Sequence, residues 1–334
     1  MRILVTGGAG YVGAPAVRLL MQSGHDVWVY DNLSTGHREA VPEGRLILGD
    51  LSEAERLDQA LVEHRIDTVM HFAASAYVGE SVQDPGKYYR NNVVNSLTLV
   101  ERMRRCGVTR LVFSSSCVTY GYPERVPITE ETPQFPINPY GNTKLACERA
   151  FADYARAYGF AVAALRYFNA SGAAADGTLG EDHDPETHLI PRVIWAALGQ
   201  IPYVEILGTD YPTPDGTCIR DYVHVEDLAE AHRRVLDFLR PGQFLAYNVA
   251  TGHGASVRDV IRTVEEISGR AVPVREAPRR PGDPALLVAD PSKIMRELGW
   301  RPHYPDLKLI VETAWRWHRD HPQGYRSMSR NRAK

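Results

Sequence analysis

The sequence is poor in several features that mark particular classes of protein. Its 334 residues include only four cysteines, with no CxxC pair, so we expect no disulfide framework and a reduced, cytoplasmic setting. No apolar run is long enough to cross a membrane or to form a signal peptide. We therefore expect no membrane association.

Neither sign of charge dominates the chain. Lys and Arg total 38, Asp and Glu total 41, and the net charge is -3, which argues against a nucleic-acid partner. Apolar residues make up 44% and charged residues 24%, which excludes a disordered or fibrous protein. We expect no metal site, because His and Cys form no short cluster and the pair His318 and His321 has no evident third ligand.

The first half of the chain alternates between two kinds of segment. Short, nearly continuous apolar runs predict strands at residues 3–6, 27–30, 46–48, 68–71, 111–113 and 160–165, and longer amphipathic stretches predict helices at 11–23, 54–64, 88–105 and 140–157. This alternation predicts an α/β protein with a doubly wound parallel sheet of the Rossmann type. We expect residues 1–175 to form this domain, with a returning strand near 245–250.

The pattern changes after about residue 175. We predict helices at 189–198, 226–239, 256–268 and 307–318, with Ser256 as an N-cap. Residues 176–325 are expected to form mainly a smaller C-terminal α/β substrate domain. Residues 326–334 carry basic residues and no acid, and we expect a disordered tail.

A glycine-rich turn follows the first predicted strand. The segment TGGAGYVG at residues 6–13 places Gly7, Gly10 and Gly13 between a strand and a helix, where backbone N–H groups can bind a dinucleotide pyrophosphate. Asp31 ends the second strand, and its carboxylate can bind ribose hydroxyls but would repel a 2′-phosphate. The sequence therefore favours NAD over NADP as cofactor, with Asp50 as a candidate contact to the adenine.

Tyr140 and Lys144 lie four positions apart at the start of a predicted helix, so they share one face. An ammonium group beside a phenol lowers the pKa of the phenol, and a positively charged nicotinamide would lower it further. Together they would make Tyr140 a general base. Residues 114–116 are three serines at the end of the fifth predicted strand. A hydroxyl there can bond the substrate or Tyr140, and spacing alone does not say which serine acts.

These residues carry a resemblance to a known family. The segments TGGAGYVG (6–13), HFAASAYVGES (71–81), SSSCVTYG (114–121), PYGNTK (139–144) and DYPTPDGTCIRDYVHVEDLA (210–229) make the chain similar to extended short-chain dehydrogenases/reductases, and within them to the UDP-glucose (UDP-galactose) 4-epimerases. The likeness runs from about residue 2 to residue 325.

The resemblance implies a role for particular residues. The catalytic set would be Ser116, Tyr140 and Lys144. Cofactor contacts would be Gly7, Gly10, Tyr11, Val12, Asp31, Asn32, Asp50, Leu51, Phe72, Ala73, Ala74, Asn91, Tyr140, Lys144 and Tyr167. The UDP-sugar would be held by Ser116, Asn169, Leu189, Arg220, Tyr222, Arg280, Asp283 and Leu287.

The resemblance also implies a reaction. A UDP-hexose would be epimerised reversibly at C4 through a 4-keto intermediate, with transient hydride transfer to tightly bound NAD. A 4-epimerase of another UDP-sugar (an N-acetylhexosamine, a pentose or a uronate) is the alternative, and Leu287 is intermediate in size between residues that exclude and admit N-acetyl sugars. Cys117 and Val118 offer no acidic pair of the kind that 4,6-dehydratases need. A homodimer through helices 88–105 and 140–157 is a further implication.

Overall fold

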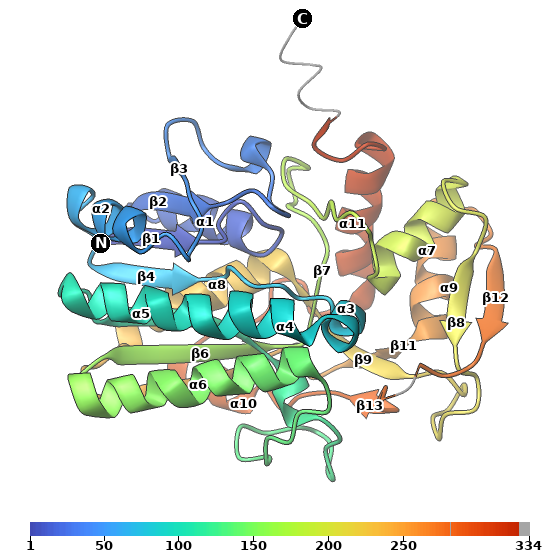
Figure 1. Cartoon of the computed structure of the whole chain (residues 1–334). Coiled ribbons are helices and arrows are strands. Elements are labelled where there is room, and N and C mark those ends of the chain that lie inside the picture. Colours follow the sequence, from blue (N-terminus) through green and yellow to red (C-terminus); the bar gives the residue numbers. More distant parts are fainter. Residues whose placement is uncertain (281, 327–334) are drawn as a thin grey trace, which may run out of the picture.

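A seven-stranded parallel sheet organises the first half of the molecule. The computed structural model describes residues 1–280 and 282–326, so most of the predicted tail at 326–334 lies outside the described residues. The strand order is β10-β6-β5-β4-β1-β2-β3, and each neighbouring pair is parallel. The strands are β1 (Arg2–Thr6), β2 (Asp26–Asp31), β3 (Leu46–Leu48), β4 (Thr68–His71), β5 (Arg110–Ser116), β6 (Ala161–Tyr167) and β10 (Phe244–Val249). The predicted doubly wound α/β sheet is confirmed (Figure 1).

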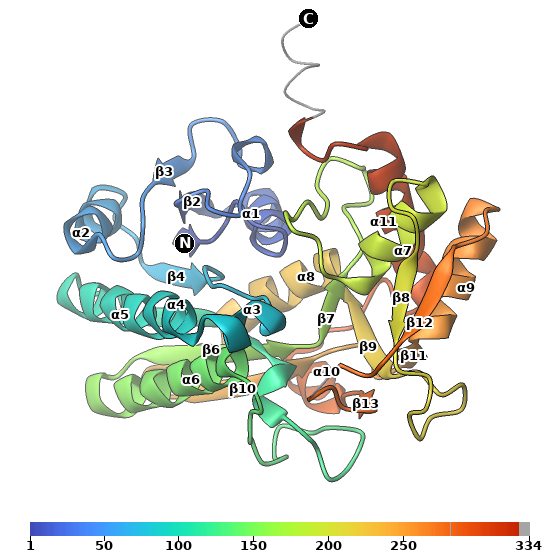
Figure 2. The same cartoon turned by 45° about the vertical axis from the view of Figure 1, so that its right-hand side comes forward.

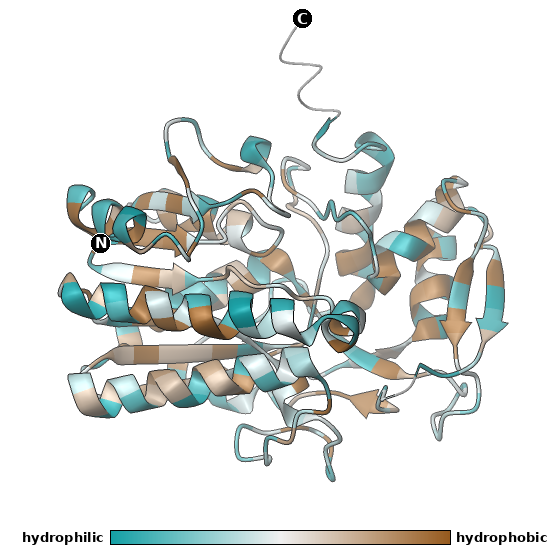
Figure 3. Cartoon of the chain, in the orientation of Figure 1, coloured by the Kyte–Doolittle hydropathy of each residue, from teal (hydrophilic) through white to brown (hydrophobic). Residues whose placement is uncertain are grey.

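Helices cover both faces of this sheet. One face packs against α1 (Gly13–Gln22), α8 (Val225–Val235) and α10 (Ser292–Leu298), and the other against α2 (Ala54–Glu63), α5 (Asn95–Arg105) and α6 (Pro139–Tyr158). Along β1, Ile3 and Val5 belong to the first apolar cluster and Leu4 to the second, since successive side chains of a strand point to opposite faces. Figure 3 shows alternating hydrophobic and hydrophilic bands along α5 and α6, as expected for helices with one buried side.

A smaller set of elements packs beside the carboxyl edge of the sheet (Figures 1 and 2). Strand β9 (Ile219–His224) pairs with β7 (Asn169–Ser171), β11 (Gly254–Ser256) and β13 (Leu286–Leu287), and β8 (Val204–Leu207) pairs with β12 (Val274–Ala277). Helices α7 (Leu189–Leu198), α9 (Val257–Ser268) and α11 (Leu307–Asp320) share one apolar cluster. Ser256 caps α9 in a capping box with Asp259, so the predicted N-cap is confirmed.

Some predicted boundaries differ from the structure. The single helix expected at 88–105 is divided into α4 (Pro85–Tyr88), a π-helical turn η2 (Tyr89–Val94) and α5, and it is preceded by α3 (Val78–Gln83). The helix expected at 226–239 ends earlier and continues as the short η4 (Leu236–Phe238). Short 3₁₀ turns η1 (Arg38–Ala40) and η3 (Cys117–Tyr120) complete the set.

In residues 1–280 and 282–326, no helix is both long and apolar enough to cross a membrane.

Candidate active site

The glycine-rich turn lies where the chain order of the sheet reverses, between β1 and β4, which is where open α/β sheets bind ligands. A Cβ on Gly7 would lie 2.4 Å from the backbone nitrogen of Ala73, and one on Gly13 would lie 2.3 Å from the carbonyl oxygen of Gly7. Gly7 also has a positive φ of 73°. The turn therefore requires glycine, and Val12, which precedes α1, supplies no side-chain cap to the first N–H groups of the helix.

Two acidic residues lie beside this turn. Asp31 accepts hydrogen bonds from the backbone nitrogens of Ala9 (3.0 Å) and Leu33 (2.8 Å), and burial raises the pKa of its carboxyl group. The amide of Asn32 donates to Asp50 at 2.7 Å. Asp31, Asn32 and Asp50, predicted from separate strand ends, are thus neighbours, and the adjacent Leu51 is buried.

The residues after β4 close the other side of the turn. The backbone nitrogens of Phe72 and Ala73 donate to the carbonyl oxygen of Thr6, at 2.8 and 3.0 Å. Ala74 is half-buried next to them, and Asn91, in η2, donates to the hydroxyl of Ser75 at 3.1 Å. Tyr11 donates to the carbonyl oxygen of Gly172 at 2.7 Å, so its hydroxyl is already engaged within the chain.

The structure distinguishes the three serines at the end of β5. Ser114 bonds the hydroxyl of Tyr167 at 2.8 Å and Ser115 donates to Glu148 at 2.5 Å, whereas Ser116 interacts with Tyr140 and lowers the pKa of its phenol. The structure therefore favours Ser116 as the serine that acts with the candidate base.

Tyr140 and Lys144 occupy the first two turns of α6, which Asn138 caps by accepting from the backbone nitrogen of Gly141 at 2.8 Å. Both side chains are buried. The ammonium nitrogen of Lys144 donates to the carbonyl oxygen of Ser114 at 2.8 Å and lies 5.8 Å from the centroid of the Tyr140 ring. The two residues therefore share one helix face, as predicted.

The lowering of the Tyr140 pKa that we expect from Lys144 and nicotinamide together stays a prediction, and in the chain by itself this pKa is raised. Burial raises the pKa of the Tyr140 phenol, the neighbouring Tyr167 adds to this, and the hydrogen bond with Ser116 only partly opposes it. Burial also lowers the pKa of Lys144 to about 8. Because desolvation disfavours any isolated charge, one ammonium group at this distance does not make the phenol acidic.

Most candidate substrate residues meet around β9. Asn169 lies opposite Tyr222 in the register of β7 and β9 and donates to the carbonyl oxygen of Asp221 at 2.9 Å. Leu287 lies opposite Arg220 in the register of β13 and β9. Arg220 forms an ion pair with Asp283 although its side chain is only 12% exposed, so this is no ordinary surface salt bridge.

The two remaining candidates lie on other elements. Leu189 is the first residue of α7. Arg280 is exposed, in the segment that precedes β13.

Sequence reasoning missed two groups of polar residues near the site. Glu148, one turn after Lys144, forms an ion pair with Arg166. Glu181, His183, Glu186 and His188 cluster in the loop between β7 and α7, and the spacing E-x-H-x-x-E-x-H at 181–188 was the signal that could have revealed them.

A Rossmann-type sheet, a glycine turn at its switch point and a Ser-Tyr-Lys set define a dinucleotide-dependent enzyme of the extended short-chain dehydrogenase/reductase class. The family model described as "NAD dependent epimerase/dehydratase family" matches residues 3–250. The chain belongs to this NAD-dependent family.

Individual relatives agree with this assignment. The chain is 48% identical to a UDP-glucose 4-epimerase of Halalkalibacterium halodurans, over 99% of this chain and 100% of that one. A crystal structure of UDP-glucose 4-epimerase from Brucella ovis in complex with NAD is 51% identical, with a TM-score of 0.91 over 94% of this chain and 97% of that one. The enzyme from Bifidobacterium longum, solved with NAD+ and UDP, is 38% identical, with a TM-score of 0.93 over 97% and 100%.

Proposed function

We propose that this protein epimerises a UDP-hexose, UDP-glucose or UDP-galactose, reversibly at C4 with NAD as a resident cofactor. The observation that carries the proposal is the pair Tyr140 and Lys144 on one face of α6, next to Ser116 at the end of β5, at the edge of the sheet that also holds the glycine turn. The relatives named above, similar over nearly their whole lengths, support the same reaction.

The residues of the site fit NAD. At Gly7 and Gly13 a Cβ would meet backbone atoms, so only glycine permits this tight turn. The N-terminus of α1, which has no side-chain cap, can then bind a pyrophosphate. Asp31 keeps lone pairs free beyond the two backbone bonds that it accepts, so it can also bind ribose hydroxyls and repel a 2′-phosphate.

The mechanism assigns a task to each catalytic side chain. The Oη atom of Tyr140 takes the proton of the sugar 4-hydroxyl and later returns it, and Ser116, which lowers the pKa of Tyr140, would orient that oxygen. When bound, NAD would supply an acceptor for the hydride from C4 and, in its oxidised form, a positive charge. Lys144, held by the carbonyl oxygen of Ser114, adds a second positive charge behind Tyr140.

We propose that the elements around β9 bind the UDP-sugar. Arg220 and Arg280 would make charge-assisted bonds to the diphosphate, and Asp283 keeps Arg220 in position by their ion pair. Asn169, Tyr222 and Leu189 would line the nucleotide and sugar. Residues 1–175 would then serve mainly the cofactor, and 176–325 mainly the substrate.

Leu287 is our candidate for control of the sugar range. Its side chain is buried in β13, beside Arg220 in the strand register. A leucine leaves more room than a tyrosine at this point, so we expect UDP-glucose and UDP-galactose as main substrates and some activity on UDP-N-acetylhexosamines.

We also propose a homodimer, formed through α5 and α6. These two helices lie side by side in Figures 1 and 2, and the segment from η2 into α5 exposes the apolar side chains Tyr89, Val94 and Leu97. A cytoplasmic location is a further part of the proposal, and it is supported by four free cysteines.

The test uses purified protein and UDP-galactose without added NAD. Formation of UDP-glucose is expected, because the cofactor is regenerated in each cycle and can stay bound to the protein. Tyr140→Phe should lower kcat by about 10²- to 10⁴-fold, the usual contribution of a general acid-base group. Absence of conversion, with UDP-arabinose or UDP-glucuronate epimerised instead, would replace the proposed substrate with the alternative.

A further inference from the structure

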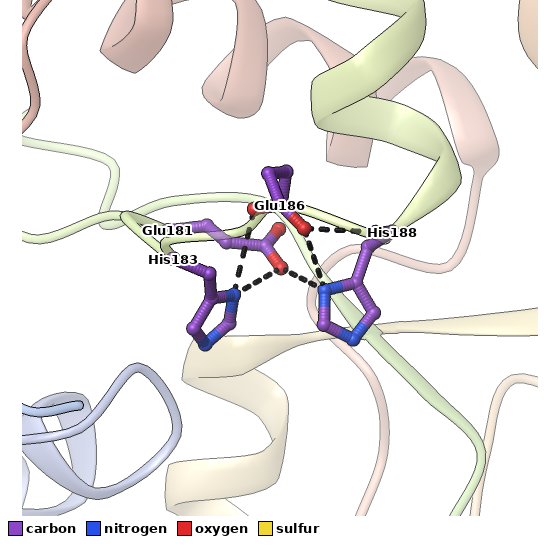
Figure 4. Close-up of side chains that lie close together, drawn as sticks. All are labelled: Glu181, His183, Glu186 and His188. Carbon is purple, nitrogen blue, oxygen red and sulfur yellow. Dashed lines mark hydrogen bonds and ion pairs between the residues drawn. The ribbon is translucent and has the colours of Figure 1, made fainter. Parts of the chain in front are cut away.

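The loop between β7 and α7 contains a compact group of side chains that the proposed reaction does not use. This Glu/His cluster consists of Glu181, His183, Glu186 and His188 (Figure 4). Nδ1 of His183 lies 3.2 Å from Oε1 of Glu181 and 3.4 Å from Oε2 of Glu186. Nδ1 of His188 lies 2.8 Å from Oε1 of each glutamate. Two imidazole nitrogens and two carboxylates therefore converge on one point.

The two carboxylates of the cluster are buried, His183 is half-buried and His188 is exposed, and three ligand atoms keep unused lone pairs. The Glu186 side chain is 0% exposed and that of Glu181 5%. Oε1 of Glu181, Oε2 of Glu186 and Nδ1 of His183 are buried without a hydrogen bond, although they lie at ion-pair distance from one another. Two buried carboxylates are costly unless positive charge compensates them. With both imidazoles neutral, the net charge is −2, which one divalent cation neutralises.

We propose that Glu181, His183, Glu186 and His188 together bind one divalent transition-metal ion, and that zinc is the best fit. Nitrogen from histidine and oxygen from carboxylate are ordinary zinc ligands, and four of them complete a tetrahedral site. Calcium and magnesium prefer sites made of oxygen alone. Because protein atoms supply all four ligands, the site has a structural role and takes no part in the chemistry of the sugar.

The backbone around the cluster is held in place from outside the loop. The indole nitrogen of Trp317, in α11, donates to the carbonyl oxygen of Glu181 at 3.0 Å, and His37 bonds the carbonyl oxygen of Asp182 at 2.8 Å. Within the loop, the backbone nitrogen of His188 also donates to Glu186 at 2.8 Å. The contacts of Trp317 and His37 would orient the ligands before a metal binds.

The position of the cluster indicates what the metal would stabilise. The ring of His183 lies 5.9 Å from that of Tyr11, beside the glycine turn, and 6.0 Å from that of Tyr77, which follows β4. His188 directly precedes Leu189, the first residue of α7. A metal here would hold the start of α7 in a fixed position relative to the glycine turn.

Two protonated histidines are the competing way to neutralise the glutamates. Although burial opposes it, Glu181 and Glu186 raise the pKa of His183 to about 9 and that of His188 to about 10. The experiment must therefore detect the metal itself rather than a dependence on pH.

The test uses the full chain as purified, treated with EDTA and then titrated with Zn²⁺ in competition with a chromophoric chelator. We expect one ion per chain, and with Co²⁺ the strong visible absorption of a four-coordinate site. The double substitution His183→Gln and Glu186→Gln should weaken binding at least about 100-fold, since the loss of mere outer-shell partners costs about 10- to 100-fold. His64→Gln, the same chemical change on a histidine that stacks on Trp28, should leave binding unchanged.

Three results would overturn the proposal: no Zn²⁺ bound by the unmodified chain, an affinity unchanged in the double variant, or the weak spectrum of six-coordinate Co²⁺. The spectrum of the unmodified chain decides the matter even where the double variant does not fold. No UDP-sugar is present in these measurements, so their outcome is independent of the epimerase activity.

Discussion

Replacing Glu148 by methionine should remove a large part of the stability of the protein, because it leaves the guanidinium group of Arg166 buried without its partner. The two side chains are 3% and 6% exposed. Nε of Arg166 donates to both carboxylate oxygens, at 3.0 and 3.1 Å, and Nη2 donates to Oε2 at 2.6 Å. Removing one member of such a buried pair costs about 3–5 kcal/mol.

The other contacts of Arg166 place the expected cost near the lower limit. Its guanidinium keeps bonds to the hydroxyl of Tyr120 at 3.0 Å, to the side chain of Gln134 at 3.2 Å and to the carbonyl oxygen of Glu130 at 3.4 Å. The charge stays hydrogen-bonded but uncompensated, so we expect a loss of about 3 kcal/mol. Against a total stability of about 5–15 kcal/mol this is a large effect.

The assay is urea unfolding of the cofactor-free protein, followed by circular dichroism and by tryptophan fluorescence. Asp153→Met removes the exposed partner of Arg156 on the same helix, where the side chains are 67% and 74% exposed, and should cost no more than about 1 kcal/mol. Adding Arg166→Met to Glu148→Met should cost less than the sum of the two single changes, since no unpaired charge then remains buried. A loss below about 1 kcal/mol for Glu148→Met, or strict additivity in the double variant, would refute the reasoning.

Three further predictions concern the site. Gly13→Ala should cost about 1–3 kcal/mol in NAD binding or folding, because its Cβ would meet the carbonyl oxygen of Gly7 at 2.3 Å. The measurement is the NAD content of the purified protein. The matched control is Gly79→Ala, whose Cβ would meet nothing within 4 Å. Leu287→Tyr should lower the activity on UDP-N-acetylhexosamines relative to UDP-hexoses. An unchanged ratio of the two initial rates would show that the side chain at position 287 does not limit the size of the sugar. Burial lowers the pKa of Lys144 from 10.5 to about 8, so the unfolded chain binds this proton more tightly, and the stability of the cofactor-free protein should rise with pH between these values. The rise should be absent from Lys144→Met in paired urea titrations, and a rise of equal size in that variant would assign it to other groups.

The sequence predicts the parallel sheet well because its signal is local. Runs such as residues 27–30 and 160–165 are apolar throughout, and strands buried on both faces need no other feature. Ser256 likewise predicts the start of α9, and the capping box that it forms with Asp259 lies within four adjacent residues. Strands β7, β11 and β13 were not predicted, because segments of two or three residues become strands only through their pairing with β9.

In the candidate site, too, local features could be predicted from the sequence and contacts between distant segments could not. Spacing is enough to place Tyr140 and Lys144 on one face, since both lie on one helix. It does not decide among Ser114, Ser115 and Ser116, because their partners Tyr167, Glu148 and Tyr140 come from β6 and α6. The ion pair of Glu148 with Arg166 was missed for the same reason.

The raised pKa of Tyr140 explains why the proposed reaction needs its cofactor for more than hydride transfer. Burial and the nearby phenol of Tyr167 disfavour the phenolate, and Lys144 is directed at the carbonyl oxygen of Ser114. Additional positive charge would favour proton removal from the sugar, and an oxidised nicotinamide ring would supply it when NAD is bound. We therefore expect the base to be more active when an acceptor for the hydride is also in place, which would couple removal of the proton to oxidation of the sugar.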